Sequence, residues 1–287
     1  MRSSYTLGGV SVVALFAFFY GALAWFDNLG TLDATWQVYC ETPLLSSYVL
    51  QPACFWSDVS FILVGLAILA YLDSVGPKTE RVMSAANPIS VSFGFVVLWM
   101  GPGSMLEHGS LNNAWGWFDA ASIHWFALFS LGIIIANWVW PAAEVMRNQT
   151  RFALVLTLAV VAVGATTVTW QHMQHGWTVI LLSATPVIVI IDYLAWASRN
   201  HRFVGRWNDR GALWVLLAMV SFGSAMICWI GAHQGNFLCP PGHGDEHLLQ
   251  AHALFHFLAA SAILFTWLYL VRRESIALDA TSARAQR

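Results

Sequence analysis

The sequence predicts an all-α integral membrane protein, from its composition, the length of its apolar runs and the placement of its positive charges. Of the 287 residues, 58% are hydrophobic and 10% are charged, whereas soluble domains carry about 25% charged residues. Eight runs approach the ~20 apolar residues that a membrane-spanning helix needs. They cover residues 5–25, 55–72, 88–107, 118–140, 152–170, 176–197, 211–232 and 250–271.

The positive charges give these eight crossings an orientation. All 13 Lys and Arg residues fall on the side of the membrane that holds the N-terminus, and the opposite side has none. Cytoplasmic loops carry the excess of basic residues, so we expect both termini in the cytoplasm. A different number of crossings would scatter the charges over both sides.

The same boundaries divide the chain into four parts. Residues 1–26 are expected to form an N-terminal transmembrane anchor. Arg2, the apolar run and the small residues Ala22-Leu23-Ala24 would also suit a cleavable signal peptide, although the run is long for one. Residues 27–54 then form an exterior loop segment, residues 55–271 a seven-helix bundle and residues 272–287 a cytoplasmic tail.

Three of the four cysteines, Cys40, Cys54 and Cys239, fall on the exterior side of this topology. An exterior or periplasmic location permits disulfides. Cys40 can pair with Cys239 or with Cys54, and the spacing does not distinguish the two pairings. We expect Cys228, inside an apolar span, to be a packing residue.

Polar residues from distant parts of the chain are expected at one depth near the exterior surface. Ser104 and His108 end the third span, Asp119 opens the fourth, and His252 and His256 open the last. Residues four apart share a helix face, so His252 and His256 can contact one ion, and Ser104 can point the same way as His108. An ionisable side chain at this depth is costly and needs a partner.

Histidines in this arrangement favour a catalytic metal. Three neutral imidazoles and one water make the open tetrahedral site of catalytic zinc, so we predict that His108, His252 and His256 bind Zn²⁺. Zinc lowers the pKa of its bound water towards about 7. Asp119 is then placed to orient a ligand or transfer a proton, and Ser104 to donate a hydrogen bond to a developing oxyanion.

Structural roles are the alternatives for several polar residues. Ser104 can bond back to a helix carbonyl, Asp58 is expected to cap the second span, and His124 is expected to be structural. The sequence HGDEH at 243–247 matches a zinc-protease pattern that requires a helix, but here it lies in a loop. The break Gly101-Pro102-Gly103 is expected to let the backbone leave the regular helix before Ser104. The other exterior histidines are expected to be solvated: His172, His175 and His233.

The motif Ser-x3-His, an Asp eleven residues later and His-x3-His at the start of the last span resembles the signature of the CREST superfamily of membrane hydrolases. Here it reads SMLEH, Asp119 and HALFH. The segments LQAHALFH, YCE and FWSDVS are similar to the alkaline ceramidases and their bacterial relatives. The resemblance covers about residues 39–271.

This resemblance implies a seven-transmembrane-helix CREST-type bundle, with one extra N-terminal transmembrane helix in this chain. It also implies that His108, His252 and His256 hold Zn²⁺, that Asp119 assists proton transfer and that Ser104 stabilises the tetrahedral intermediate.

A calcium site is implied less completely. Animal members of the family bind calcium through acidic residues before the first core helix. Glu41 is present here, but Cys54 and Ser57 stand where the family pattern has glutamate and asparagine. Glu41 alone therefore remains a candidate calcium ligand.

The implied reaction is zinc-dependent hydrolysis of the amide bond of ceramide-type lipids to a sphingoid base and a fatty acid. The exterior side lacks the Lys and Arg that commonly recognise phosphate, which favours a neutral amide lipid, and no nucleic-acid partner is expected. The alternatives are a CREST hydrolase of another lipid bond and a non-catalytic, zinc-stabilised receptor. We expect the protein in the bacterial inner membrane, with its active site toward the exterior or periplasmic face.

Overall fold

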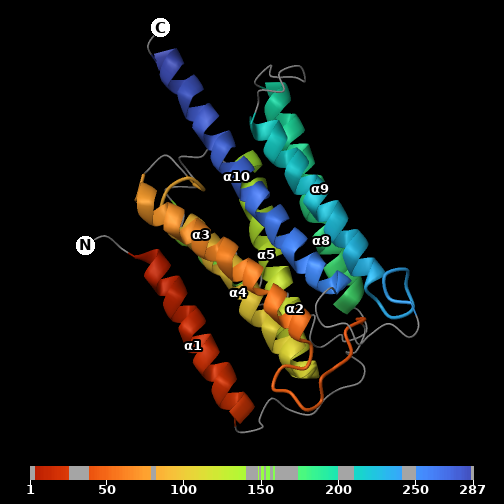
Figure 1. Cartoon of the computed structure of the whole chain (residues 1–287). Helices are drawn as coiled ribbons and strands as arrows, with labels where there is room; N and C mark the ends of the chain where they lie inside the picture. The colour runs from red at the N-terminus through yellow and green to blue at the C-terminus, as the bar shows by residue number, and fades with distance from the viewer. Residues whose placement is uncertain are drawn as a thin grey trace.

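The computed structural model describes residues 4–25, 39–78, 82–139, 148, 150–151, 153–155, 158, 174–199, 210–240 and 250–285. Within these residues the regular structure is helical, apart from one isolated β-bridge between Tyr39 and His233. The helices are α1 (Tyr5–Trp25), α2 (Pro52–Ser57), α3 (Val59–Val75), α4 (Pro88–Ser110), α5 (Asn113–Val139), α8 (Gln174–Arg199), α9 (Arg210–Gly231) and α10 (Ala251–Ala285). Figure 1 shows them as a bundle of elongated helices.

Six described helical segments are long and apolar enough to cross a membrane, which confirms the prediction of a helical integral membrane protein. They are Tyr5–Trp25, Pro52–Val75, Pro88–Ser110, Ala114–Ile135, Gly211–Gly231 and Ala251–Glu274. The total of eight crossings stays a prediction. The predicted span 152–170 lies almost entirely outside the described residues, and the side chains of α8 are described only from Thr185 on, where the apolar stretch is Thr185–Ala195.

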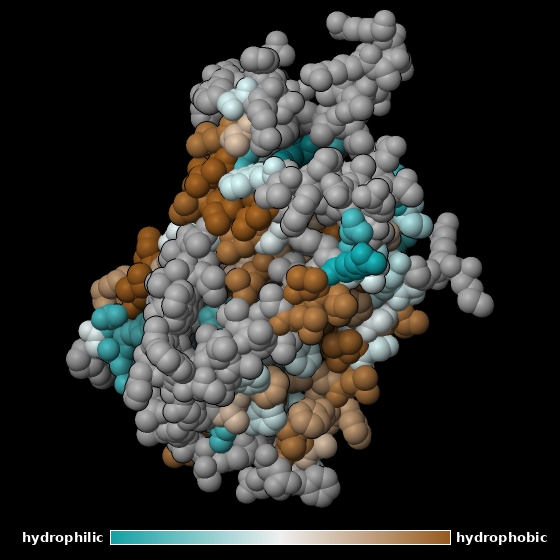
Figure 2. Space-filling view, turned by 180° about the vertical axis from the view of Figure 1, so that it is seen from behind, coloured by the Kyte–Doolittle hydropathy of each residue, from teal (hydrophilic) through white to brown (hydrophobic). Residues whose placement is uncertain are grey.

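The outer surface of the described helices is apolar. Phe18 and Leu15 of α1 are 76% and 68% exposed, and Leu63 of α3 is 61% exposed. Figure 2 shows hydrophobic side chains over much of the described part of one face. A soluble protein would hide much of this surface, whereas lipid tails solvate it without cost.

Helix α4 lies at the centre of the bundle, packed between α3 and α5. Its residues Phe93, Val97 and Leu98 are fully buried. A Cβ atom on Gly65 of α3 would come within 2.6 Å of the Leu98 backbone, so α3 and α4 touch along their main chains. Small residues permit such close helix packing in membranes.

The expected break at Gly101-Pro102-Gly103 is wrong, because α4 is continuous from Pro88 to Ser110. The two glycines serve close packing instead. A Cβ on Gly101 would lie 2.9 Å from the Asp58 carbonyl oxygen, and one on Gly103 would lie 3.2 Å from the Phe118 carbonyl oxygen. The start of α3 and the start of α5 are thereby drawn against α4 beside Ser104.

Three helix boundaries also differ from those predicted. The second span begins at Pro52 and divides into α2 and α3 at Asp58. Helix α5 begins at Asn113, five residues early, and α10 continues to Ala285. The segment 274–285 contains neither glycine nor proline, so the tail expected after residue 271 continues as helix.

Candidate metal centre

The three predicted histidines meet at one end of the bundle. Nitrogen atoms of His108, His252 and His256, one from each ring, all lie within 4.8 Å of one another. The ring centroids are 4.6–5.2 Å apart, and all three side chains are buried. His108 comes from the last turn of α4, while His252 and His256 occupy the first turns of α10. These nitrogens could bind one metal ion, whose identity stays a prediction.

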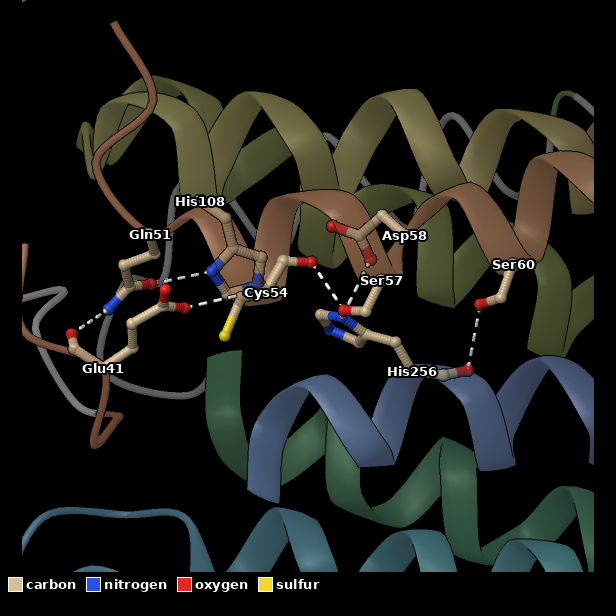
Figure 3. Close-up of polar contacts among 8 residues, drawn as sticks. All are labelled: Glu41, Gln51, Cys54, Ser57, Asp58, Ser60, His108 and His256. Carbon is tan, nitrogen blue, oxygen red and sulfur yellow. Dashed lines mark hydrogen bonds and ion pairs between the residues drawn. The ribbon is translucent and has the colours of Figure 1, made fainter. Parts of the chain in front are cut away.

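Gln51 orients the ring of His108. Its amide oxygen lies 2.8 Å from His108 Nδ1, and its amide nitrogen donates to the main-chain oxygen of Glu41 at 2.9 Å (Figure 3). Since an amide oxygen only accepts hydrogen bonds, His108 Nδ1 carries the proton. The lone pair of His108 is therefore on Nε2, the tautomer suited to a metal ligand.

Ser57 and Asp58 orient His256 in the same way. Its Nδ1 lies 2.8 Å from Ser57 Oγ and 3.0 Å from Asp58 Oδ1 (Figure 3). The Ser57 hydroxyl donates to the Cys54 carbonyl oxygen at 2.6 Å, so it accepts from the histidine. His256 Nδ1 is thus the protonated nitrogen, and Nε2 is left for a ligand.

The expectation that Asp58 caps a helix is wrong. Asp58 stands at the N-cap of α3, but its side chain makes no capping hydrogen bond. It is completely buried and contacts the His256 ring. Its carboxylate therefore belongs to the histidine cluster, as the carboxylate–histidine pairs of metal sites do.

Two nitrogens of the cluster lack a hydrogen-bond partner. Among the described residues, none bonds to His108 Nε2 or to His252 Nδ1, although both atoms are buried. Leaving a buried polar atom unsatisfied costs about 1–3 kcal/mol. His108 Nε2 is the nitrogen that His108 can offer to a metal ion, because its Nδ1 is already bonded to Gln51, and His252 also has an unpartnered nitrogen, so the donor set fits such an ion.

Ser104, Glu107 and Asp119 lie beside the histidines. Ser104 and Glu107 are buried on α4, and Asp119 reaches the same place from the second turn of α5. The Ser104 side chain is close to the carboxyl groups of both Asp58 and Asp119, and Glu107 is close to Asp119. The predicted pair Ser104 and Asp119 is thus brought to the histidines, together with a second acid that the sequence reading missed. Glu107 could have been found from the sequence, because an acidic residue inside a membrane span is rare and usually functional.

Tyr39 covers the His252 ring. The two rings stack with centroids 3.6 Å apart, and the Tyr39 hydroxyl accepts a hydrogen bond from Trp229 Nε1 at 3.1 Å. Burial raises the pKa of the Tyr39 phenol well above its ordinary value, with the Glu107 carboxylate as a further cause. Tyr39 is therefore a neutral phenol. The sequence did not predict its contact with His252, because a loop makes this contact and no periodic pattern indicates it.

A disulfide holds this loop in place. Of the two pairings open to Cys40, the structure has Cys40–Cys239. Cys54 and Cys228 are buried free thiols, and Cys228 packs against Phe255 as expected. The disulfide and the Tyr39–His233 bridge together join the segment before α2 to the loop after α9, beside His252.

Glu41, the candidate calcium ligand, caps α2. Its carboxylate accepts hydrogen bonds from the amides of Ala53 at 2.8 Å and Cys54 at 3.0 Å. Negative charge at a helix N-terminus is favourable. In the described part of the chain, the histidine trio is the only group of three or more His, Cys, Asp or Glu side chains that could hold a metal ion, and Glu41 is not part of it.

The other histidines of the described residues, His124 and His233, fall outside the cluster. His124 is buried in α5. His233, expected to be solvated, is half-buried against Tyr39, and its Nδ1 bonds the Trp229 carbonyl oxygen at 2.8 Å. His172 and the HGDEH segment lie outside the described residues, and of His175 only the helical backbone is described.

A cavity of about 110 Å³ adjoins the cluster. Its polar wall contains Tyr39, Ser104, Glu107, Asp119, His252 and His256. The remaining lining comes mainly from apolar residues of α5, α8, α9 and α10, including Phe126, Val189, Phe222, Ala259 and Ile263. The cavity therefore has one polar wall, which includes two of the three clustered histidines, and otherwise largely apolar walls.

Comparison with known proteins gives no family assignment. The sequence matches no protein-family model, and no curated protein is significantly similar to it.

Proposed function

We propose that the protein is a membrane hydrolase that uses a zinc ion held by His108, His252 and His256 to cleave the amide bond of ceramide-type lipids. One observation carries the proposal: three buried imidazoles cluster together, two of their nitrogens are without a partner among the described residues, and two of the rings, His252 and His256, line a cavity whose other walls are largely apolar. A metal that only stabilised the helices would not need such a chamber.

Zinc is the metal that suits this donor set. Imidazole nitrogens are borderline ligands that favour zinc over calcium or magnesium, and three of them leave one coordination position open. When bound, zinc supplies Lewis-acid chemistry that makes water a nucleophile near neutral pH.

The surrounding side chains account for the protons and the charge of amide hydrolysis. Asp119, with Glu107 beside it, accepts the proton of the attacking water and returns it to the leaving nitrogen. Ser104 donates a hydrogen bond to the oxygen that gains negative charge. A C–O bond forms, the C–N bond breaks, and the products are a carboxylic acid and an amine.

The lining of the cavity favours a neutral lipid. Among the described residues, it contains the carboxyl groups of Glu107 and Asp119 and no Lys or Arg. A phosphate group would meet negative charge there without the basic partners that usually recognise it. The apolar walls suit an acyl chain, and the two acids suit a nitrogen that gains a proton as it leaves.

We place the site on the exterior face and both termini in the cytoplasm. All Lys and Arg residues fall on the opposite side in the eight-crossing topology. The disulfide gives independent support, because Cys40–Cys239 lies beside His252 and such bonds persist in oxidising compartments. In bacteria this face is the periplasmic side of the inner membrane.

The test is metal analysis and lipid hydrolysis by the purified protein in detergent. We expect about one zinc per chain and release of fatty acid from a fluorescent ceramide. His252→Ala should lose both, while Ser261→Ala, an exposed hydroxyl on the same helix, should lose neither. Full hydrolysis by His252→Ala would refute the proposal. Hydrolysis of another lipid in a panel would identify a different hydrolase, and zinc without turnover of any lipid would indicate a receptor.

A further inference from the structure

The extra helix α1 is joined to the bundle at both ends. At its start, the Asp73 carboxylate of α3 accepts hydrogen bonds from the amides of Tyr5 at 2.9 Å and Thr6 at 2.8 Å, and from the Thr6 hydroxyl at 2.6 Å. Near its end, the Tyr20 hydroxyl donates to the main-chain oxygen of Tyr48 at 2.7 Å. Such bonds fix both the depth and the rotation of α1 against α3.

Packing along α1 is equally close. A Cβ on Gly9 would come within 2.9 Å of the side chains of Leu66 and Leu69. A Cβ on Gly109 of α4 would overlap the Tyr20 hydroxyl, and the Tyr20 ring packs against Phe55 with centroids 5.2 Å apart. Helix α1 thus fills a fitted place in the bundle, which a removable signal peptide would leave empty.

The contacts of Tyr20 continue directly to the metal centre. The segment that it holds, 48–51, pairs with the end of α4 through Leu50 N to Gly109 O at 3.2 Å and Gln51 N to His108 O at 2.9 Å. Gln51 then holds His108 Nδ1 through its side chain at 2.8 Å. Gln51 is three residues after Tyr48, the residue that Tyr20 holds. The segment 48–51 therefore connects Tyr20 to the ring orientation of a proposed metal ligand.

We propose that Tyr20 is a positioning residue of the metal centre and that α1 is a permanent part of the mature protein. Tyr20 keeps the segment 48–51 against α4, so that Gln51 holds His108 with its Nε2 directed to the other two imidazoles. The inference rests on the proposed function only in requiring that the histidines bind zinc.

The first test measures zinc affinity by chelator competition, which does not depend on catalysis. Outer contacts of metal ligands typically contribute 10–100-fold to affinity, and we expect Gln51→Ala to weaken zinc binding by about this factor. Tyr20→Phe, which removes only the hydroxyl, should weaken it by roughly threefold to tenfold, as a more remote contact of the same kind. Ser11→Ala is the matched control, since its hydroxyl is exposed and bonds within α1, to the Leu7 carbonyl oxygen.

Combining the variants shows whether Tyr20 acts through Gln51. Residues in one network are non-additive, so the double variant should bind zinc no more weakly than Gln51→Ala alone. An effect of Tyr20→Phe equal to that of Ser11→Ala, or a fully additive double variant, would overturn the assignment. Wild-type protein that binds no zinc would instead overturn the proposed function, and this inference with it.

The second test is the intact mass of the protein purified from membranes. We expect the mass of the full chain, 31.8 kDa, apart from processing of the initiator methionine. A mature protein that begins after Ala24 would show that α1 is removed, and Tyr20 could then have no role.

Discussion

The two ends of the helical bundle treat their buried charges differently. Away from the histidines, the buried Asp192 carboxylate accepts hydrogen bonds from Trp138 Nε1 at 2.6 Å and the Tyr269 hydroxyl at 2.8 Å, and pairs with Arg273 at 3.1 Å. Glu274 is satisfied by the amides of residues 82–84. Arg273 lies 21 residues after His252, roughly 30 Å along α10 at 1.5 Å per residue.

At the histidine end the carboxyl groups crowd together. Asp58, Glu107 and Asp119 are mutually close, and neither oxygen of Asp58 accepts a well-formed hydrogen bond from the described residues beyond its contact with His256. Among the described residues, none bonds to His108 Nε2 or to His252 Nδ1 either. Both oxygens of Asp192, in contrast, have partners, and the partnerless atom next to it among the described residues is Nε of Arg273, whose guanidinium is held by the ion pair.

This difference separates folding from function. A buried charge with several donors joins helices, whereas buried groups left without partners destabilise the fold and persist only for another reason. Asp192 joins α5, α8 and α10 and belongs to the first kind. The histidine cluster belongs to the second. Variants near Asp192 should therefore lower stability and leave zinc affinity unchanged, whereas variants at the cluster should lower zinc affinity and change stability little.

The largest loss of stability is expected at the satisfied end. Asp192→Ala leaves Arg273, which is only 13% exposed, without its partner, and breaking a buried pair costs about 3–5 kcal/mol. Unfolding of the protein in detergent should show this loss, while the dissociation constant for zinc stays unchanged. Ser198→Ala, an exposed hydroxyl on the same helix, is the control. A loss below about 1 kcal/mol, as for an exposed ion pair, would contradict the role given to Asp192.

The reverse signature is expected for Asp58→Asn. The amide keeps the shape of the carboxylate but removes the charge that favours a protonated His256 Nδ1, so zinc affinity should fall about tenfold, or ~1.4 kcal/mol. The metal-free protein should lose little stability, since the variant also removes a poorly satisfied buried charge. Chelator competition and metal-free unfolding measure the two effects. Unchanged zinc affinity with a large loss of stability would place Asp58 with Asp192.

The sequence predicted the residues that meet at the cluster because their spacing and depth are both readable. His252 and His256 share a helix face four residues apart, and the membrane restricts where each span can begin and end. Their meeting with His108 and Asp119 follows from topology. The count of spans remains a prediction, since it depends partly on residues 152–170.

The supporting residues could not be predicted in the same way. Gln51 acts through a loop that folds back onto α4, and Tyr39 through a loop held by Cys40–Cys239; neither contact leaves a periodic pattern. Asp58 precedes an apolar run, which is also the pattern of a helix cap. The Asp58 carboxylate contacts His256 instead of the α3 amides, and this follows from the tertiary position of His256.

The smallest effect is expected at Glu41, which combines features of a satisfied structural charge and of a residue that supports the histidine cluster. Its carboxylate is satisfied by the α2 amides, yet its main-chain oxygen holds Gln51, which orients His108. Glu41→Gln should cost about 1 kcal/mol of stability as a weakened cap, with zinc affinity unchanged because the main-chain oxygen remains. Thermal unfolding with and without added calcium checks this. If calcium stabilises the wild type but not Glu41→Gln, the carboxylate is a calcium ligand as well as a cap; if calcium affects neither, the cap is its whole role.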